Sequence, residues 1–347
     1  MIAEVRSCAS CDETGCAMHR PGTSWNSEAQ RTAWLLDDVW PETASIMAAA
    51  FRSNDQLLAP GIVTGFPGRY GWPVRVTRAA VAETISRHWA MRRVARASGA
   101  VRNRTYLEQD AAIARALAKA IDYRARHLVV AQGWLPWLGQ AGALGGRSFD
   151  VVMSRYPFAE IHRLLDEAAA ELGASATIAD FRADPALVDA EADLLAQARR
   201  IITPHHGIAA LFPGRAELLT WHRPAARERA AGNRVAFLGP TIARQRPDIA
   251  RRLARSLDEP LVVFGSLIEG SWEGLPIERR SMGPRWLDGI GAILHPATMT
   301  NQPRPLLEAV AGGVAVYATP TCGLAPGDYR PLESFPTGPL VSAALAG

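Results

Sequence analysis

Several short apolar runs in the C-terminal half of the chain end in residues that could bind phosphate or sugar groups. The run Val235–Leu238 is followed by Gly239, and Arg244 and Arg246 come soon after. An arginine guanidinium is a planar fork that can donate two parallel hydrogen bonds to a phosphate. We therefore expect Arg244, together with Arg246, to clamp a diphosphate and to stabilise the charge that collects on it when it leaves.

Two further runs end in a similar way. Leu261–Phe264 precedes Gly265, and Ala292–Leu294 precedes His295 and a polar stretch. That stretch supplies the remaining candidate ligand contacts, which are Thr300, Asn301, Gln302 and Arg304. Because the carboxyl ends of parallel strands meet at one edge of a sheet, we expect these residues and Gly239 to line a single binding site.

Glu308 comes next, in a helix that Pro303 and Pro305 are expected to start. A carboxylate is favoured near a helix N-terminus, and its two oxygens can accept hydrogen bonds from both hydroxyls of a ribose. Main-chain amides around Asn301 and Gln302 would meet anionic oxygens there. Taken singly, each residue is better explained without a ligand: Arg304 and Glu308 could form a helix-surface ion pair, and Gly265 could be an ordinary turn glycine. Their order along the chain favours the binding role.

A second cluster lies near the N-terminus, where three cysteines and a histidine follow the spacing Cys8-x2-Cys11-x4-Cys16-x2-His19. Three thiolates and an imidazole form a known tetrahedral ligand set for zinc, which makes zinc the preferred cofactor. An iron–sulfur cluster is the alternative metal group. Free thiols or a partial disulfide would explain the same residues without a metal.

Alternating strand-like and helix-like segments must position these residues, and they predict parallel sheets covered by helices. We expect a helical stretch from Trp34 to Phe51, a helix from Ile249 to Leu257 that lies on a sheet, and a strand at Val314–Ala318. The expected strands of the N-terminal half are Leu128–Ala131, Phe149–Met153 and Ala176–Ala179. The polar segment Pro224–Asn233 separates the two sheets. The expected organisation is an extension over residues 1–58, a domain over 59–226 and a domain over 227–347.

Three stretches of the N-terminal half offer further candidate residues. His205 and His206 follow the strand-like Ile202-Thr203. Either could face a ligand cleft, with His205 as the candidate catalytic residue, but an ordinary core or surface histidine explains each of them better. Gln132–Trp137 follows another strand, and its tryptophans would either stack on an acceptor sugar or pack a domain edge. Asp180–Arg182, at the end of the expected strand Ala176–Ala179, is the third stretch that could face the ligand cleft.

Composition excludes several classes of function. The net charge is +4, and basic and acidic residues are interleaved, whereas a nucleic-acid-binding protein normally shows a clustered basic face. No apolar run reaches the roughly 18 residues of a membrane span. Met1–Arg20 lacks the apolar centre of a signal peptide. We expect a soluble cytoplasmic protein.

The C-terminal motifs occur in an order that resembles the retaining GT-B glycosyltransferases grouped as family 4. Leu307–Gly313 reads Leu-Glu-Ala-Val-Ala-Gly-Gly and is followed by a strand and by Cys322-Gly323. In that family a glycine-ended strand carries Arg and Lys that clamp the diphosphate of a sugar nucleotide, and a later helix opens with Glu-x7-Glu. The resemblance spans about residues 191–325. Thr300 stands where the first glutamate would be, and Pro240 stands at the usual position of the clamp arginine.

The resemblance implies an α/β, GT-B-like fold of two Rossmann-like parallel-sheet domains behind a cysteine-containing extension. The N-terminal domain would bind the acceptor, and the C-terminal domain would bind the nucleotide sugar. The implied activity is that of a hexosyltransferase type of glycosyltransferase, which moves a sugar from a nucleotide-sugar donor to an unidentified acceptor with retention. A non-catalytic nucleotide-sugar-binding protein, with a cysteine segment that senses metal or redox state, is the alternative. A sugar-nucleotide epimerase of the same fold is a weaker third possibility.

Overall fold

The computed structural model describes residues 31–61, 72–173 and 175–336, and these residues form two compact units. Unit 1 contains the chain up to Met153, together with Ala183–Thr203 and Phe212–Leu219. Unit 2 contains Ser154–Arg182, Pro204–Leu211 and the chain from Thr220 onward. The candidate metal ligands Cys8, Cys11, Cys16 and His19 lie outside the described residues.

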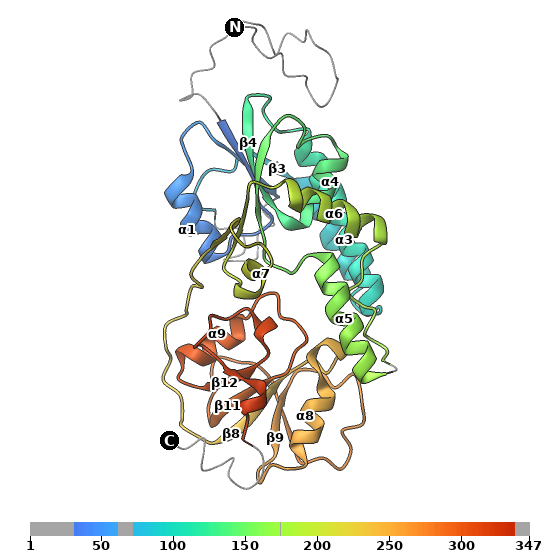
Figure 1. Ribbon diagram of the computed structural model, residues 1–347, viewed down its shortest axis with the longest axis vertical. Coiled ribbons are helices and arrows are strands. Elements are labelled where there is room, and N and C mark those ends of the chain that lie inside the picture. Colours follow the sequence, from blue (N-terminus) through green and yellow to red (C-terminus); the bar gives the residue numbers. More distant parts are fainter. Residues whose placement is uncertain (1–30, 62–71, 174, 337–347) are drawn as a thin grey trace, which may run out of the picture. The chain divides into compact units, whose positions relative to one another are not determined.

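Unit 1 is built on a parallel sheet whose seven described strands lie in the order β3-β2-β1-β4-β5-β6-β7. The strands are β1 Arg31–Leu35, β2 Gln56–Pro60, β3 Arg78–Ala80, β4 Ala125–Ala131, β5 Ser148–Val152, β6 Arg200–Thr203 and β7 Ala216–Leu218. Its helices are α1 Pro41–Ala50, α2 Val81–Arg93, α3 Gly99–Ala118, α4 Leu135–Gln140 and α6 Pro185–Gln197, with the 3-10 turn η3 Gln132–Trp134. Figure 1 shows α1 on one side of this sheet and α3, α4 and α6 on the other. The central strands are apolar because helices cover both faces of such a sheet. β1 pairs with β4 through Trp34 and Val129.

Unit 2 has the same winding, with six described parallel strands in the order β10-β9-β8-β11-β12-β13. These strands are β8 Arg234–Leu238, β9 Leu261–Phe264, β10 Ile277–Arg280, β11 Ile290–His295, β12 Ala315–Ala318 and β13 Arg330–Pro331. Its helices are α5 Phe158–Leu172, α7 His206–Ala210, α8 Pro247–Ala254 and α9 Arg304–Ala311, with the 3-10 turns η4 Ala243–Gln245, η5 Pro320–Cys322 and η6 Leu332–Ser334.

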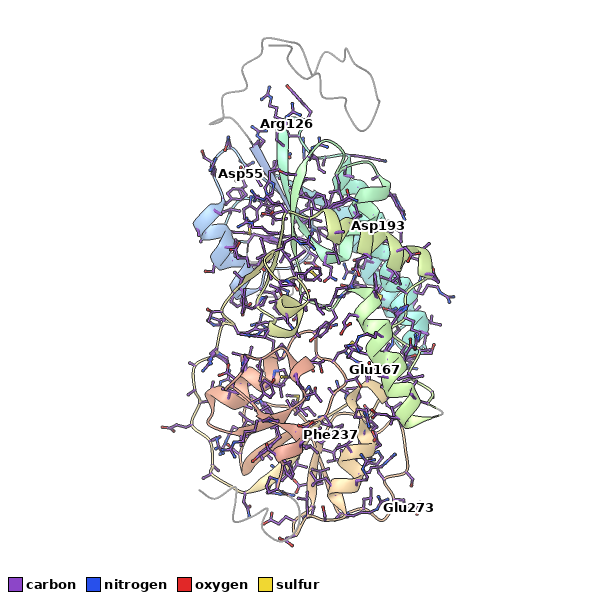
Figure 2. All side chains as sticks on the ribbon, viewed as in Figure 1. Asp55, Arg126, Glu167, Asp193, Phe237 and Glu273 are labelled. Carbon is purple, nitrogen blue, oxygen red and sulfur yellow. The ribbon has the colours of Figure 1, made fainter. Side chains whose placement is uncertain are left out.

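Side chains on both faces of the second sheet are buried in separate apolar cores. Phe264 packs edge-on against Trp286 on one face, with ring centroids 5.4 Å apart. Phe237 packs near Trp272 on the other face, where Leu253 of α8 also lies. Figure 2 shows Phe237 among the strands of unit 2 and Glu273 at the periphery of that unit. A sheet that is covered on both faces leaves only its edges for polar ligands.

The expected fold class of two parallel-sheet α/β units is confirmed. The strands expected after Asn233 and the helix expected at Ile249–Leu257 are present as β8, β9, β11, β12 and α8. The two earlier strands at Leu128–Ala131 and Phe149–Met153 are present as β4 and β5.

Two expectations about the N-terminal half differ from the structure. Residues 176–179 form a bend and a turn, not a strand. Trp34 and Leu35 belong to β1 in the middle of the first sheet, and the helix starts only at Pro41. The expected boundary at residue 58 therefore cuts through a sheet. The apolar spacing that favoured one long helix comes from a short buried strand followed by a helix.

Candidate ligand site of the second sheet

The winding of unit 2 reverses between β8 and β11, which lie side by side at the centre of its sheet. Chain from β8 passes outward to β9 and β10 and then returns to β11. In open α/β sheets, ligands bind at the carboxyl ends of the strands where the strand order reverses. The residues after Leu238 and from His295 onward occupy this position, which makes them the candidate site.

Gly239 and Gly265 let the ends of β8 and β9 approach closely. The N–H of Gly239 donates to the carbonyl of Phe264 at 2.8 Å, and a Cβ on Gly239 would lie 2.4 Å from that oxygen. Gly265 has a φ of 89°, and a Cβ on it would lie 3.2 Å from the backbone of Gly239. Both predicted site glycines are therefore required by the packing of the main chain.

A hydrogen-bond network fixes the turn η4 that carries Arg244. The hydroxyl oxygen of Thr241 accepts from the backbone N–H of Ile268 at 2.6 Å. The carboxylate of Glu269 accepts from the N–H of Thr177 at 2.7 Å. The hydroxyl oxygen of Thr177 in turn accepts from the N–H of Ala243 at 2.8 Å. Arg244 thus projects from a turn that is tied to two other segments of unit 2.

Arg244 is a mostly buried cation that has no carboxylate partner among the described residues. Its guanidinium carbon lies 4.3 Å from the centre of the Phe181 ring. Its Nε is buried without a hydrogen-bond partner. Burial lowers the pKa of Arg244, and no neighbouring acid acts in the other direction. Burial of an unpaired charge is costly, so this position is suited to an anionic ligand that would satisfy the guanidinium.

His295, the last residue of β11, lies within the electrostatic range of Arg244. Its side chain is 4 % exposed, and its Nε2 is 2.6 Å from the hydroxyl oxygen of Thr300. Its Nδ1 is buried without a partner. Burial, and after it the charge of Arg244, lowers the pKa of His295 to about 4. The imidazole is therefore neutral near neutral pH.

Thr300 uses its polar groups within unit 2. Its carbonyl accepts from Nε2 of His205 at 2.7 Å, and its N–H donates to the carbonyl of Thr321 at 3.2 Å. Its hydroxyl is bonded to His295. The predicted contact of Thr300 with a sugar hydroxyl would have to compete with these bonds.

His205 is fully buried, and both of its ring nitrogens hold main-chain groups. Nδ1 accepts from the N–H of Ile208 at 3.1 Å and so caps α7, while Nε2 donates to Thr300. The Tyr156 ring packs edge-on against the imidazole, with centroids 4.8 Å apart. Burial lowers the pKa of His205 to about 4. Of the two alternatives for His205, a catalytic residue or a core histidine, the geometry matches a buried histidine that positions the loop around Thr300.

Helix α9 starts at Arg304, so Glu308 is its fifth residue and lies beyond the first turn. The helix-dipole argument for this carboxylate is therefore weaker than its sequence position indicated. Glu308 is partly accessible, with 31 % of its side chain exposed, and its nearest cation is Arg227 at 3.8 Å. Pro303 and Pro305 have no N–H, which leaves few free amides at this helix start.

The other polar residues before α9 differ in their surroundings. The side-chain oxygen Oδ1 of Asn301 is buried without a partner, and Gln302 is partly exposed. The guanidinium of Arg304 lies 5.1 Å from the ring centre of Trp221. Among these residues, Asn301 offers the clearest unsatisfied group for a ligand.

Arg246, unlike Arg244, forms ion pairs with two carboxylates. Its guanidinium lies 3.0 Å from Asp248 and 2.7 Å from Glu171, and these partners raise its pKa. Its backbone is left-handed, with a φ of 55°. We predicted that Arg246 would share the diphosphate clamp, but its charge is already balanced.

Two residues near Arg244 were not predicted as ligand contacts. Thr298 donates its N–H to the carbonyl of Arg244 at 2.7 Å, and its hydroxyl oxygen is buried without a partner. His295 was noted only as a residue at the end of a strand. A polar residue at the carboxyl end of a buried apolar strand was the available signal for His295.

Unit 1 also has a cluster of polar residues at the carboxyl ends of β1 and β4, the two neighbouring strands between which its strand order reverses. Arg87 of α2 pairs with Asp110 of α3 at 2.9 Å. Gln132 donates to Glu191 at 3.1 Å. Burial, and after it the charge of Asp38, raises the pKa of Asp37. The sequence drew attention to Gln132 but not to the three acids Asp37, Asp110 and Glu191.

The tryptophans of this region are divided between core and surface. Trp134 is fully buried, so it packs in the core of unit 1 and is not available for a sugar. Trp137 is partly exposed.

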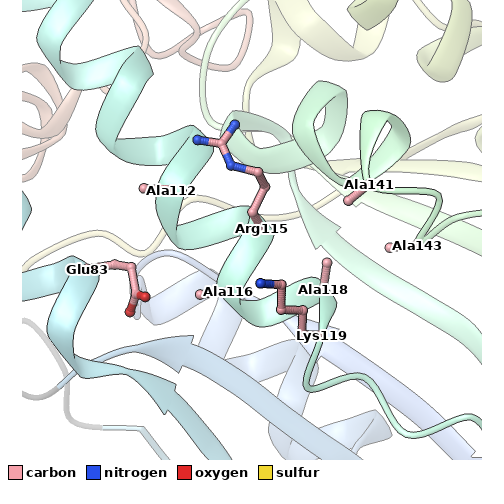
Figure 3. Close-up of a pocket in the computed structure, with 8 residues that line it drawn as sticks. All are labelled: Glu83, Ala112, Arg115, Ala116, Ala118, Lys119, Ala141 and Ala143. Carbon is pink, nitrogen blue, oxygen red and sulfur yellow. The ribbon is translucent and has the colours of Figure 1, made fainter.

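Unit 1 also has an open pocket of about 490 Å³ on its helices (Figure 3). Its lining residues are Glu83, Ala112, Arg115, Ala116, Ala118, Lys119, Ala141 and Ala143. None of the predicted site residues lines this pocket. Five of its eight lining residues are alanines, and the charged ones are Glu83, Arg115 and Lys119.

Among the described residues, no group of three or more His, Cys, Asp or Glu side chains is arranged to hold a metal ion. The described helices also include none that is long and apolar enough to cross a membrane.

No protein-family model matches the chain, and no curated protein sequence matches it. Solved structures with a related arrangement are glycosyltransferases. The lipopolysaccharide outer core galactosyltransferase WaaB, in its apo form, is 9% identical with a TM-score of 0.43, over 87% of this chain and 84% of that chain. Os79 from O. sativa, in complex with UDP, is 14% identical with a TM-score of 0.45, over 84% of this chain and 82% of that chain. LpCGTa, in complex with UDP, is 12% identical with a TM-score of 0.41, over 92% and 93%.

Proposed function

We propose that this chain is a glycosyltransferase that binds a nucleotide-sugar donor on unit 2 and transfers the sugar to an unidentified acceptor. The observation that carries this proposal is Arg244, a mostly buried arginine without a carboxylate partner, at the carboxyl end of β8 where the winding of the sheet reverses. A diphosphate would supply the missing negative charge.

The side chains at this site have distinct proposed roles. Arg244 binds the diphosphate and offsets the charge that develops when it leaves. Glu308 accepts hydrogen bonds from the ribose hydroxyls, since its carboxylate is partly exposed and only loosely paired. Asn301 supplies a further polar contact. Gly239 and Gly265 allow the main chain at the ends of β8 and β9 to pack closely beside the site. His205 and Thr300 hold the loop before α9 in place.

The reaction that these residues would support is a glycosyl transfer. The bond between the anomeric carbon and the phosphate oxygen breaks, and its electron pair remains on the diphosphate. The acceptor hydroxyl oxygen bonds to the anomeric carbon, and its proton passes to the departing phosphate or to water. The family 4 resemblance implies retention of configuration. We assign the acceptor to unit 1, where Asp37 and Gln132 lie at the carboxyl edge of the sheet.

The test has two steps. Purified protein is first screened by thermal shift against nucleoside diphosphate sugars, and the best ligand is then incubated with candidate acceptors while the released nucleoside diphosphate is measured. Binding and release by the wild type, with much slower release by Arg244→Ala, is the expected result. The anomeric proton signals of the product report retention or inversion directly. A chain that binds none of these donors contradicts the proposal.

One observation favours a second candidate, a nucleotide-sugar-binding protein without catalysis. Thr300 stands where the resemblance places a carboxylate, and its N–H, carbonyl and hydroxyl are all engaged within unit 2. A donor sugar would lose a charge-assisted contact at this position. Tight donor binding without release of nucleoside diphosphate, across a broad set of acceptors, would support this alternative.

A further inference from the structure

The donor diphosphate carries more negative charge than Arg244 alone can balance. A nucleotide-sugar diphosphate has two negative charges at neutral pH. Arg244 provides one buried positive charge, whereas Arg246 is already paired with Asp248 and Glu171. A second positive charge near Arg244 would therefore improve binding.

His295 is the titratable residue placed to provide that charge. It lies at the end of β11, its Nδ1 is buried without a partner, and Nε2 is held by the hydroxyl of Thr300. Arg244 on η4 is the charged group that acts on it directly. Beyond Thr300 lies His205 of α7, which is also neutral and has both ring nitrogens engaged. No carboxylate acts on His295 among the described residues.

We propose that His295 is the second cationic group of the donor site, neutral when the site is empty and protonated by solvent when a diphosphate binds beside Arg244. This inference rests on the proposed function, because it concerns the same site. The imidazole would act on the bound anion together with Arg244, and it need not touch the phosphates.

The sign of this linkage follows from the surroundings of His295. In the empty site, burial and the charge of Arg244 both disfavour the imidazolium. A bound diphosphate neutralises Arg244 and adds negative charge, and both changes raise the pKa of His295. A group whose pKa rises on binding takes up protons, so affinity increases as the pH falls between the two values. The effect approaches tenfold per pH unit within that window.

The same proton would assist transfer. When the sugar leaves, its electron pair stays on the diphosphate, which gains one negative charge. An imidazolium beside Arg244 offsets that charge as it develops.

Calorimetry of the full-length protein tests the inference. The probe is the tightest binder among UDP-, ADP-, GDP- and TDP-glucose, whose diphosphates do not titrate near neutral pH. Binding at about pH 6 is measured in buffers of different ionisation enthalpy, which yields the number of protons taken up. We expect uptake that approaches one proton in the wild type. His295→Gln should show no uptake and roughly tenfold weaker binding. His222→Gln is the matched control, since His222 is exposed in the same unit, and it should behave like the wild type.

The possible results distinguish the protonation of His295 from the proposed function itself. A wild-type binding enthalpy that is the same in all buffers overturns the inference about His295, and so does uptake that persists in folded His295→Gln. If His295→Gln does not fold, the wild-type measurement and the imidazole NMR signals with and without the probe still decide the question. Failure of the wild type to bind any of the four probes would count against the proposed function itself.

Discussion

The ring of Phe181 covers the guanidinium of Arg244, with 4.3 Å between the guanidinium carbon and the ring centre. Phe181 belongs to the turn after α5, and Arg244 belongs to η4, so this contact joins distant parts of unit 2. An aromatic face partly compensates a buried cation while leaving its hydrogen-bond donors for a ligand. The contact therefore positions the guanidinium of Arg244 for an anionic ligand and leaves its positive charge unpaired.

Replacing Phe181 with leucine should weaken diphosphate binding about three- to tenfold, because it removes a cation–π contact of roughly 0.5–1.5 kcal/mol but keeps an apolar cover. Calorimetry with the best-binding nucleoside diphosphate measures the change. Phe212→Leu is the matched control, since Arg215 lies 5.7 Å from the Phe212 ring centre in unit 1. An unchanged affinity in Phe181→Leu would show that the ring does not position Arg244.

Replacing Glu308 with alanine should reduce nucleotide affinity about tenfold and leave thermal stability nearly unchanged. The ribose would lose charge-assisted hydrogen bonds of about 1.5–3 kcal/mol, whereas the exposed ion pair with Arg227 contributes at most about 1 kcal/mol to folding. The affinity for a 2′,3′-dideoxynucleotide should be the same in Glu308→Ala and the wild type. Equal losses for both nucleotides would rule out the ribose contact.

Much of unit 2 could be predicted from the sequence, because its strands are short apolar runs that end in glycine or a polar residue. The proposed role of Arg244 rests on its position after β8, which the sequence already indicates. The environment of His205 could not be predicted in this way, because its partners Ile208 and Thr300 come together only in the folded chain. Arg246 illustrates the same limit, because its partner Glu171 lies on α5, far away in the sequence.

The first sheet was harder to predict for a different reason. β1 is a five-residue strand directly before α1, and its buried Trp34 and Leu35 fit the apolar spacing of a helix. Only the pairing of β1 with β2 and β4 fixes the strand. The polar residues Asp37 and Asp110 escaped notice because their proximity to Arg87 is set by tertiary packing.

Stability should fall as the pH drops below the ordinary range of histidine. His205 and His295 both have folded pKa values of about 4, below the usual 6.5, so the unfolded chain binds more protons between these values. Each histidine then costs up to about 1.4 kcal/mol per pH unit across this window. Urea unfolding at a series of pH values from about 7 to 4 measures the slope. His205→Gln should be less stable at pH 7 but show a shallower slope, and an unchanged slope would contradict a buried neutral His205.

The N-terminal cysteine cluster is expected to bind about one zinc ion through Cys8, Cys11, Cys16 and His19. Metal analysis of protein purified under reducing conditions without chelator should find that ion, and Cys11→Ser should lose most of it. Donor affinity should be the same in both proteins, because the four ligands are local in sequence. A metal-free wild type would eliminate the site, and bound iron with sulfide would identify the alternative cluster.

The most direct test of the account compares a nucleoside diphosphate with its own nucleoside in wild type and Arg244→Ala. The account predicts at least a tenfold loss of affinity for the diphosphate, an unchanged affinity for the nucleoside, and a thermal stability that is equal or higher once the buried unpaired charge is gone. Arg252→Ala, which removes an exposed arginine of α8, should change neither affinity. Equal losses for nucleoside and diphosphate in Arg244→Ala, or no loss for either, would contradict the assignment of Arg244 as the diphosphate ligand.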